Sequence, residues 1–455
     1  MTTQERTTIP TFQGTWSPRP ESIDHSSGSS RPAWEPTVAE VLRPIIAVIM
    51  GEQSRVRFEF WDDSAVGPAS GVGSVVVHSP DALRRLLWAP GELGLARGYV
   101  SGDLDIRGDL VGVLGGLRDA APRDLHMGVA LFVRALRAAQ RLGVIGAPPE
   151  RPHEEAVPRG IRHSKRRDAE VISHHYDIGN EFYELVLGPS LTYSCARFVL
   201  DTMSLEAAQG AKHDLVCRKL GLHRRPGMTL LDVGCGWGSM ALHAARSYGA
   251  NVVGVTLSTA QADEARRRVS QAGLEGQVEI RVQDYRDLAG ETFDAISSIG
   301  MFEHVGRSRM AEYFEVLHQL LGPTGRLLNH AISSVGGSQL GRHSFIGRYV
   351  FPDGELLDVG DVVLAMERVG FEVRDVESLR EHYAKTLRAW VLNLQAGWDR
   401  AVELVGTRRA RVWLLYMAAS VIGFDDGGIS IHQVLAVKPG SDGQSLMPST
   451  RIDWL

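Results

Sequence analysis

The chain has little of what would stabilise a secreted protein or anchor one in a membrane. Its 455 residues include 3 cysteines, all between positions 195 and 235 and without a paired pattern, as in a reducing compartment. The apolar runs at residues 44–50 and 412–422 are well short of the roughly 20 residues that cross a bilayer. Residues 1–36 contain no apolar segment and predict a disordered tail, not a signal peptide. We expect a cytoplasmic protein that is soluble or peripheral at the inner membrane face.

An excess of basic charge and the common metal-binding motifs are also missing. Lysine and arginine total 49 against 54 acidic residues, a net charge of −5, which argues against a protein that binds nucleic acid mainly through phosphate contacts. The pairs His174-His175 and Glu303-His304 bring together residue types that bind metals, but no HExxH or CxxC spacing accompanies them. We therefore expect neither a nucleic-acid partner nor a metal ion.

The length predicts two or three domains. Strand patterns at residues 56–60 and 73–78, followed by a helical pattern at 80–87, indicate a small N-terminal α+β domain. We place the boundaries, in chain order, as a disordered tail at 1–36, the N-terminal domain at 37–150, a basic linker at 151–167, the main domain at 168–438 and a flexible glycine- and serine-rich tail at 439–455.

A helix predicted at residues 129–142 carries Arg134, Arg137 and Arg141 along one face, with aliphatic residues opposite. That pattern is typical of a helix on a membrane surface. An ordinary solvent-facing helix packed on a core would show it equally well. The basic linker at 151–167 allows the same two interpretations, because charge runs usually mark a solvated surface.

The most informative stretch is the glycine-dense turn at residues 230–238. An apolar strand runs into Gly234, Gly236 and Gly238, and helix-forming sequence follows. Glycine permits positive φ and removes Cβ atoms where a ligand presses against the backbone. A tight strand-to-helix turn would use the same glycines for steric reasons alone. The third glycine also comes too early for the dinucleotide fingerprint.

With Asp232 placed before the glycines, the turn resembles motif I of class I S-adenosylmethionine methyltransferases. This resemblance implies a Rossmann-like α/β sheet in which Asp232 and the glycine backbone surround the methionine and ribose. Later strands are predicted at 251–255, 278–282 and 293–298, and ligands bind beyond the carboxyl ends of such strands. The polar residues at the first two ends are Thr256, Leu257 and Gln261, expected at the ribose, and Asp284 and Tyr285, expected at the adenine.

Six ordered segments extend the resemblance to the cyclopropane-fatty-acyl-phospholipid synthases, the family that includes the mycolic acid cyclopropane synthases. They span most of the chain and lie at residues 91–99, 175–180, 192–195, 230–238, 302–306 and 382–387. The resemblance implies that the N-terminal domain binds lipid. It also adds Tyr176, Tyr193 and Ser194 to the residues expected around S-adenosylmethionine.

The family reaction joins the sulfonium methyl to an alkene, forms a carbocation on the acyl chain and removes a proton to close a ring. Such a site should be dry and aromatic. The resemblance implies that bound bicarbonate is the base and that the residues around it are Cys195, Glu303, His330, the backbone of Ile332, and Tyr383. Taken singly, each has a plainer explanation as a core or capping residue.

The function expected is therefore transfer of a methylene unit to a cis double bond of a phospholipid acyl chain at the membrane surface. The same cation could instead yield a methylene- or methyl-branched chain of the tuberculostearic type. Two further hypotheses are a methyltransferase for a small soluble nucleophile and a lipid-binding scaffold that has lost its chemistry. The predicted N-terminal lipid module argues against the former, and the intact glycine turn against the latter. A homodimer is left open.

Overall fold

The computed structural model describes residues 35–51, 54–120, 129–156, 178–337, 341, 344–352 and 354–454. The chain divides into two compact units. The smaller comprises Met1–Glu155, His343–Phe345 and Gly406–Ile422, and the larger comprises Ala156–Arg342, Ile346–Val405 and Gly423–Leu455. The smaller unit therefore includes a segment from the C-terminal part of the chain, far from the boundary predicted near residue 150. Most of the predicted N-terminal tail and most of the predicted linker lie outside the described residues.

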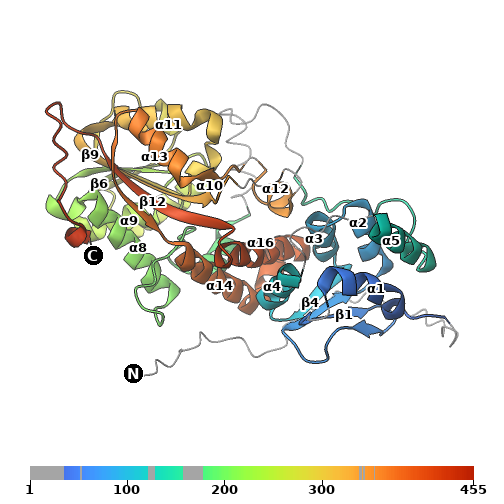
Figure 1. Ribbon diagram of the computed structural model, residues 1–455. Coiled ribbons are helices and arrows are strands. Elements are labelled where there is room, and N and C mark those ends of the chain that lie inside the picture. Colours follow the sequence, from blue (N-terminus) through green and yellow to red (C-terminus); the bar gives the residue numbers. More distant parts are fainter. Residues whose placement is uncertain are drawn as a thin grey trace, which may run out of the picture. The chain divides into compact units, whose positions relative to one another are not determined.

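The smaller unit is built on a four-stranded sheet in the order β2-β1-β3-β4. Its strands are β1 Val56–Phe60, β2 Ala65–Val66, β3 Gly73–Val77 and β4 Leu104–Gly108. β1 and β3 run parallel, and the two outer strands are antiparallel to their neighbours. The helices of its N-terminal segment are α1 Val38–Met50, α2 Pro80–Trp88, α3 Glu92–Ser101, α4 Leu110–Ala120 and α5 Val129–Arg141. The strands and helices predicted from the sequence correspond to β1, β3, α2 and α5 (Figure 1).

A buried ion pair ties the C-terminal segment of this unit to its sheet. Arg411 lies in α16, Thr407–Asp425, and its Nη2 is 3.0 Å from Oδ2 of Asp105 in β4. Both side chains are almost completely buried. Arg411 also donates to the carbonyl of Tyr99 at 3.0 Å, and its guanidinium lies 5.0 Å from the centre of the Tyr99 ring.

The larger unit contains an eight-stranded, mainly parallel sheet, as the motif I resemblance predicts. Its strands are β5 Thr229–Val233, β6 Asn251–Thr256, β7 Val278–Val282, β8 Phe293–Ile299, β9 Leu321–Ser334, β10 Leu357–Asp358, β11 Glu372–Ser378 and β12 Ile429–Val437. The order is β11-β12-β9-β8-β5-β6-β7, with β10 beside β9. Only the β11–β12 and β12–β9 pairs are antiparallel. The strand order reverses between β5 and β8, where such sheets bind ligands.

Two apolar clusters fill the two faces of this sheet because successive residues of a strand point to opposite sides. Leu230 packs with α8 Leu205–Leu220, α9 Ser239–Tyr248 and α10 Thr259–Gln271. Leu231 packs with α11 Met310–Leu320 and α13 Val359–Arg368 on the other face. Figure 1 shows this three-layer arrangement. The remaining helices of the unit are α7 Asn180–Leu187, α12 Phe345–Tyr349, α14 Arg380–Ala396 and α15 Trp398–Val405, of which α12 begins at the unit boundary.

The C-terminal segment differs from the flexible tail that its composition predicts. Trp454, in the 3₁₀ turn Arg451–Trp454, is buried in the cluster that packs on α8. Arg224 donates to the carbonyl of Leu446 and pairs with Asp453. The buried tryptophan and these hydrogen bonds pack the end of a glycine- and serine-rich segment against the rest of the larger unit. Within the described residues, no helix is long and apolar enough to cross a membrane.

Candidate active site

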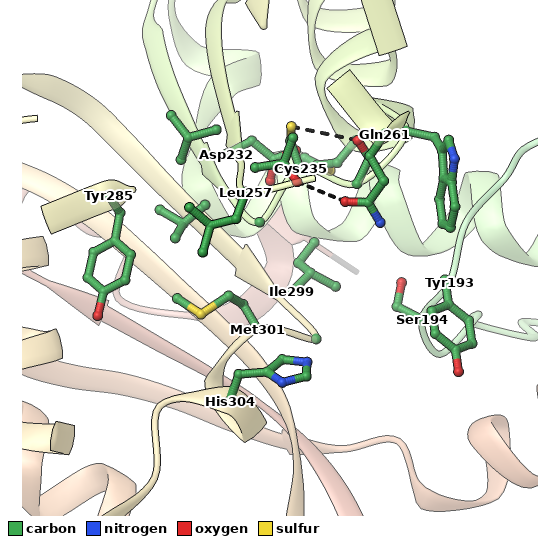
Figure 2. Close-up of a pocket in the computed structure, with 18 of the residues that line it drawn as sticks. Tyr193, Ser194, Asp232, Cys235, Leu257, Gln261, Tyr285, Ile299, Met301 and His304 are labelled. Atoms are coloured by element: carbon green, nitrogen blue, oxygen red, sulfur yellow. Dashed lines mark hydrogen bonds between the residues drawn. The ribbon is translucent and has the colours of Figure 1, made fainter. Parts of the chain in front are cut away.

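A pocket opens at the carboxyl ends of β5, β6, β7 and β8, where the polar sequence motifs meet (Figure 2). Its lining contains all the predicted cofactor residues that the structure describes except Gly238. They are Tyr193, Ser194, Asp232, Gly234, Gly236, Thr256, Leu257, Gln261, Asp284 and Tyr285. Tyr176 lies outside the described residues. The parallel topology explains this convergence, because it brings every strand's carboxyl end to one edge.

The glycine turn at the end of β5 needs glycine for conformation and for space. Gly234, Gly236 and Gly238 have φ values of 74°, 54° and 77°, in the left-handed region that side chains disfavour. A Cβ at Gly234 would also lie 3.0 Å from the Met301 side chain. The backbone N–H of Gly234 donates to the carbonyl of Val255 at 2.9 Å, which fixes the turn against β6. Substitution here would therefore displace the pocket wall.

Asp232 places a buried carboxyl group on the pocket floor. Its Oδ1 accepts a hydrogen bond of 2.7 Å from Ser297 in β8. Its Oδ2 is inaccessible and has no hydrogen-bond partner in the described part of the chain. Burial raises the pKa of Asp232 to about 6, because the charged form loses its hydration. A cationic ligand group close to Asp232 would offset the cost of burying its charged form.

The ribose and adenine sides of the pocket are held by local bonds. Thr256 donates to Oε1 of Gln261 at 2.8 Å, and Ser258 caps the start of α10 by accepting from the Gln261 N–H. This leaves the amide nitrogen of Gln261 to face a ligand. Asp284 is bound through both oxygens by Arg286. Of the two residues expected at the adenine, Asp284 thus forms an ion pair with Arg286, next to the ring of Tyr285.

Glu303 and Ile332 of the predicted anion site are in direct contact. Oε1 of Glu303 accepts from the backbone N–H of Ile332 at 2.7 Å, so the N–H expected to hold bicarbonate is occupied by the carboxyl group. The Glu303 residue is partly exposed, but its Oε2 is buried and has no partner among the residues described. Burial raises the pKa of Glu303 to about 7. The group is therefore largely protonated below neutral pH and can donate from its free oxygen.

His330 lies two residues before Ile332 in β9 and is completely buried. Its Nδ1 is 3.1 Å from Nε2 of Gln433, the residue paired with it across β9 and β12. In this amide orientation Gln433 donates, so the ring proton lies on Nε2. Nε2 has no partner within the described ranges, and burial lowers the pKa of His330 well below its usual value. The ring is a neutral donor.

The thiol of Cys195 and the backbone N–H of Tyr383 both contact the carbonyl group of Leu379. Cys195 is completely buried, and its thiol lies 3.7 Å from the carbonyl of Leu379. The N–H of Tyr383 donates to the same carbonyl at 3.0 Å, and the N–H of Leu379 donates to Ile431 in β12. Burial raises the pKa of the Cys195 thiol, so it is no thiolate nucleophile. Cys195 and Tyr383 lie outside the lining of the cofactor pocket, as do Glu303, His330 and Ile332.

Aromatic rings connect the pocket with this second group. The Tyr193 ring centre is 5.4 Å from that of Trp390, which is 6.0 Å from Tyr383. Tyr383 in turn lies 4.8 Å from Phe424. On the other side, Tyr193 is 5.9 Å from Tyr183. Such a lining excludes water and can stabilise positive charge, which is what the expected cation requires.

Several side chains of the site were missed at the level of sequence. Trp390 and Gln433 belong to no motif named above, and Lys212 lines the pocket from α8. The heptad-like spacing of Trp390 with Tyr383 on α14 could have indicated the first of these. For Gln433 only the pairing of β12 with β9 supplies the signal. No group of three His, Cys, Asp or Glu side chains suited to a metal ion occurs among the described residues.

Comparison with known proteins agrees with this geometry. A family model described as mycolic acid cyclopropane synthetase matches residues 163–434. The chain is 42% identical over 420 residues to the probable fatty acid methyltransferase Rv3720 of Mycobacterium tuberculosis, covering 90% of this chain and 97% of that one. It is 34% identical over 371 residues to the cyclopropane-fatty-acyl-phospholipid synthase of Escherichia coli, covering 80% and 88%.

A solved structure of mycolic acid cyclopropane synthase CmaA1, in complex with SAH and CTAB, is similar to the larger part of the chain. Its TM-score is 0.56 at 36% identity, with 59% of this chain and 98% of that chain covered. The fold of the larger unit is therefore that of a class I S-adenosylmethionine methyltransferase.

Proposed function

The chain belongs to the mycolic acid cyclopropane synthetase family and is an S-adenosylmethionine-dependent methyltransferase of that type, and from this premise we propose that it transfers a methylene unit to a cis double bond of a phospholipid acyl chain. The product is a cyclopropane fatty acid. The observation that carries the proposal is a pair of buried polar atoms that have no hydrogen-bond partner in the part of the chain that the structure describes, Oε2 of Glu303 and Nε2 of His330. Each is a buried group with a free hydrogen-bonding position, which suits a bound anion.

We further propose that the proton of the former methyl group passes to a bound bicarbonate. Glu303 with its raised pKa and the neutral ring of His330 both offer a donor proton, and two donors suit an anion. The Ile332 N–H, in contact with Glu303, fixes the orientation of that carboxyl group. A thiolate or an ionised carboxylate at the same place would repel an anion, and burial disfavours both forms.

The series of aromatic rings supports a carbocation on the acyl chain over a polar methyl acceptor. Tyr193 and Trp237 line the cofactor pocket, and Trp390 and Tyr383 continue from it. Aromatic faces stabilise a desolvated cation by roughly 1 to 2 kcal/mol, and they offer few nucleophilic atoms that could trap it. Tyr383, which offers a hydroxyl, lies at the far end of this chain of rings, next to Phe424.

For the smaller unit we propose contact with an anionic membrane surface. Arg134, Arg137 and Arg141 are all exposed on α5. Phe132 and Leu136 on the same helix are 54% and 41% exposed, whereas Leu131 and Ala138 face the core. Exposed arginines beside exposed apolar side chains are typical of a helix that lies in a membrane interface.

The test is to express the chain in a host rich in cis-unsaturated phospholipid and to analyse the acyl chains by mass spectrometry. Gain of one CH₂ with loss of the double bond supports ring formation. No new acyl product, with the protein folded and S-adenosylhomocysteine bound, would contradict the proposal.

A branched product is the second candidate, favoured by the similarity to the protein named a probable fatty acid methyltransferase. It follows from the same cation if a hydride shift precedes loss of the proton. Gain of one CH₂ with the double bond retained identifies a methylene branch, and gain of CH₂ plus two hydrogens after a reduction step identifies a methyl branch. Catalytic hydrogenation under conditions that open cyclopropanes distinguishes the ring from a saturated branch.

A further inference from the structure

We propose that Lys212 binds the α-carboxylate of S-adenosylmethionine, so that Lys212 and Asp232 together form a receptor for the amino-acid end of the methyl donor. The inference rests on the proposed function only for the identity of the donor. It does not depend on which acyl product is formed. Lys212 matches none of the motifs through which the cofactor site was predicted.

Lys212 is a buried ammonium group that has no ion-pair partner among the described residues, although Asp232 acts on it electrostatically from a longer distance. It is 1% exposed, and its Nζ donates to the Ser194 hydroxyl at 3.0 Å. No carboxylate lies within ion-pair distance of it in the described part of the chain. Isolated buried ammonium groups are costly, and burial lowers the pKa of Lys212 to about 7. An anionic group arriving with a ligand would remove this penalty.

A second lysine on the same helix shows what a structural role looks like. Lys219 is also completely buried, but its Nζ lies 2.9 Å from Asp375 and 2.5 Å from Glu377. Its charge is therefore compensated inside the protein. Lys212, seven residues earlier in α8, has only a hydroxyl. Within the described ranges, Lys212 thus has no ion-pair partner of its own, and Asp232 acts on it only through a longer-range electrostatic interaction, so the ammonium group can still accept an anionic ligand group.

The position of Lys212 selects the carboxylate among the groups of the donor. Lys212, Ser194 and Asp232 all line the cofactor pocket. Figure 2 shows Ser194 on one side of this pocket and Tyr285, which follows β7, on the opposite side. With adenine beside Tyr285, the amino-acid end of the donor reaches Ser194. The carboxylate is the only anionic group of S-adenosylmethionine, and the free Oδ2 of Asp232 suits its ammonium group.

Lys212 is not needed to hold Ser194 in place. The Ser194 carbonyl accepts from Nε2 of Gln209 at 2.8 Å. The next residues are fixed by the Arg197 N–H to the Ala208 carbonyl and by the Ala196 N–H to the Thr386 hydroxyl, each at 3.0 Å. The segment thus has three anchors besides the lysine. A role limited to folding would leave the ammonium group redundant.

The experiment measures ligand affinity without any acyl acceptor, by titration calorimetry. The ligands are S-adenosylhomocysteine and its decarboxylated analogue, which lacks only the carboxylate. The variants are Lys212→Met and, as a control that removes one positive charge from the exposed side of α8, Arg218→Gln. We expect Lys212→Met to weaken S-adenosylhomocysteine on the order of tenfold or more, as loss of a charged hydrogen bond does. The affinity of Lys212→Met for the decarboxylated analogue should differ from that of the wild-type protein by less than about twofold. Arg218→Gln should leave the affinity for both ligands unchanged.

Equal weakening of both ligands by Lys212→Met would overturn the inference, because the lysine would then shape the pocket without contacting the carboxylate. Unchanged affinity for both would overturn it too and would place the carboxylate elsewhere. If Lys212→Met does not fold, the wild-type protein decides, since equal affinity for the two ligands contradicts a carboxylate receptor. Failure of the wild-type protein to bind S-adenosylhomocysteine at all would instead refute the proposed function.

Discussion

At the scale of single residues, the candidate site contains several ionisable groups whose pKa values are shifted by burial. Glu303 and Asp232 both have raised pKa values, while those of Lys212 and His330 are lowered. Desolvation is the largest cause in all four. Perturbed groups of this kind concentrate at functional sites because stability is given up there for reactivity or binding.

Glu303 gives a prediction for stability against pH. Its pKa rises from the ordinary 4.5 to about 7 on folding, so the folded protein holds a proton that the unfolded chain has lost between these values. Its contribution is therefore fully present below pH 4.5 and is lost as pH rises through 7. We expect Glu303→Gln to gain stability relative to wild type, by about 1 kcal/mol or more, between pH 5 and pH 8. Urea denaturation at both pH values measures the free energy of unfolding of the two proteins. A difference between them that is the same at pH 5 and pH 8 would contradict the prediction.

The residues predicted to surround bicarbonate give a second prediction, which concerns turnover. Glu303→Gln and Cys195→Ser keep the shape of the site but change its proton donors, so each should lower kcat by roughly a hundredfold or more. S-adenosylhomocysteine binding should change little, because neither residue lines the cofactor pocket and only transition-state interactions are removed. Glu312→Gln, on the exposed side of α11, is the matched control. Loss of cofactor binding in either variant would show that the two subsites are not separate.

At the scale of elements, α5 carries the prediction that concerns membranes. Replacing both Phe132 and Leu136 by serine should weaken sedimentation with anionic vesicles by about tenfold or more, because each buried apolar side chain contributes on the order of 2 kcal/mol. As the control, Ile452→Ser changes an apolar residue that is even more exposed, 74% accessible, and lies outside α5. The solvent-facing interpretation of this helix would be favoured if the double variant bound vesicles as well as the wild-type protein does. It would also be favoured if the double variant and Ile452→Ser lost binding equally.

The arginines of α5 can be tested in the same assay. Each basic residue near an anionic surface contributes about 1 kcal/mol, and this attraction weakens with salt. Vesicle binding of the wild-type protein should therefore decrease as anionic lipid is removed or salt is added. Vesicle binding that responds neither to anionic lipid nor to salt would show that the arginines do not contribute and that only the apolar contact remains.

At the scale of the whole molecule, the smaller unit is assembled from segments far apart in the chain. Arg411 of α16 is the buried partner of Asp105 in β4. Removing one member of a buried pair leaves an uncompensated charge, which typically costs about 3 to 5 kcal/mol. Arg411→Met should therefore destabilise the protein strongly. The double variant Arg411→Met with Asp105→Asn should recover much of the loss, as measured by urea denaturation; no recovery would mean that packing and not charge is responsible.

Much of the cofactor site could be predicted from the sequence. The residues at the ends of β5, β6 and β7 follow hydrophobic strands directly, and parallel topology brings strand ends together whatever the details of packing. The positive φ of Gly234 and Gly236 follows from the same local pattern. Local order and a simple topological rule are sufficient for this part. The roles assigned to these residues, and the domain boundaries, stay predictions.

Other features required the tertiary structure. Lys212 faces the pocket from the middle of a helix, and Gln433 reaches His330 only through the register of β12 on β9. The Ile332 N–H is bound by Glu303, and Trp454 orders a tail whose composition indicates flexibility. Each depends on contacts between residues distant in sequence. The sequence by itself determined the methyl donor and the sheet that binds it, because short-range patterns encode both. Only the folded chain decided which buried charges remain without a partner, because packing alone sets which counter-ions come within reach.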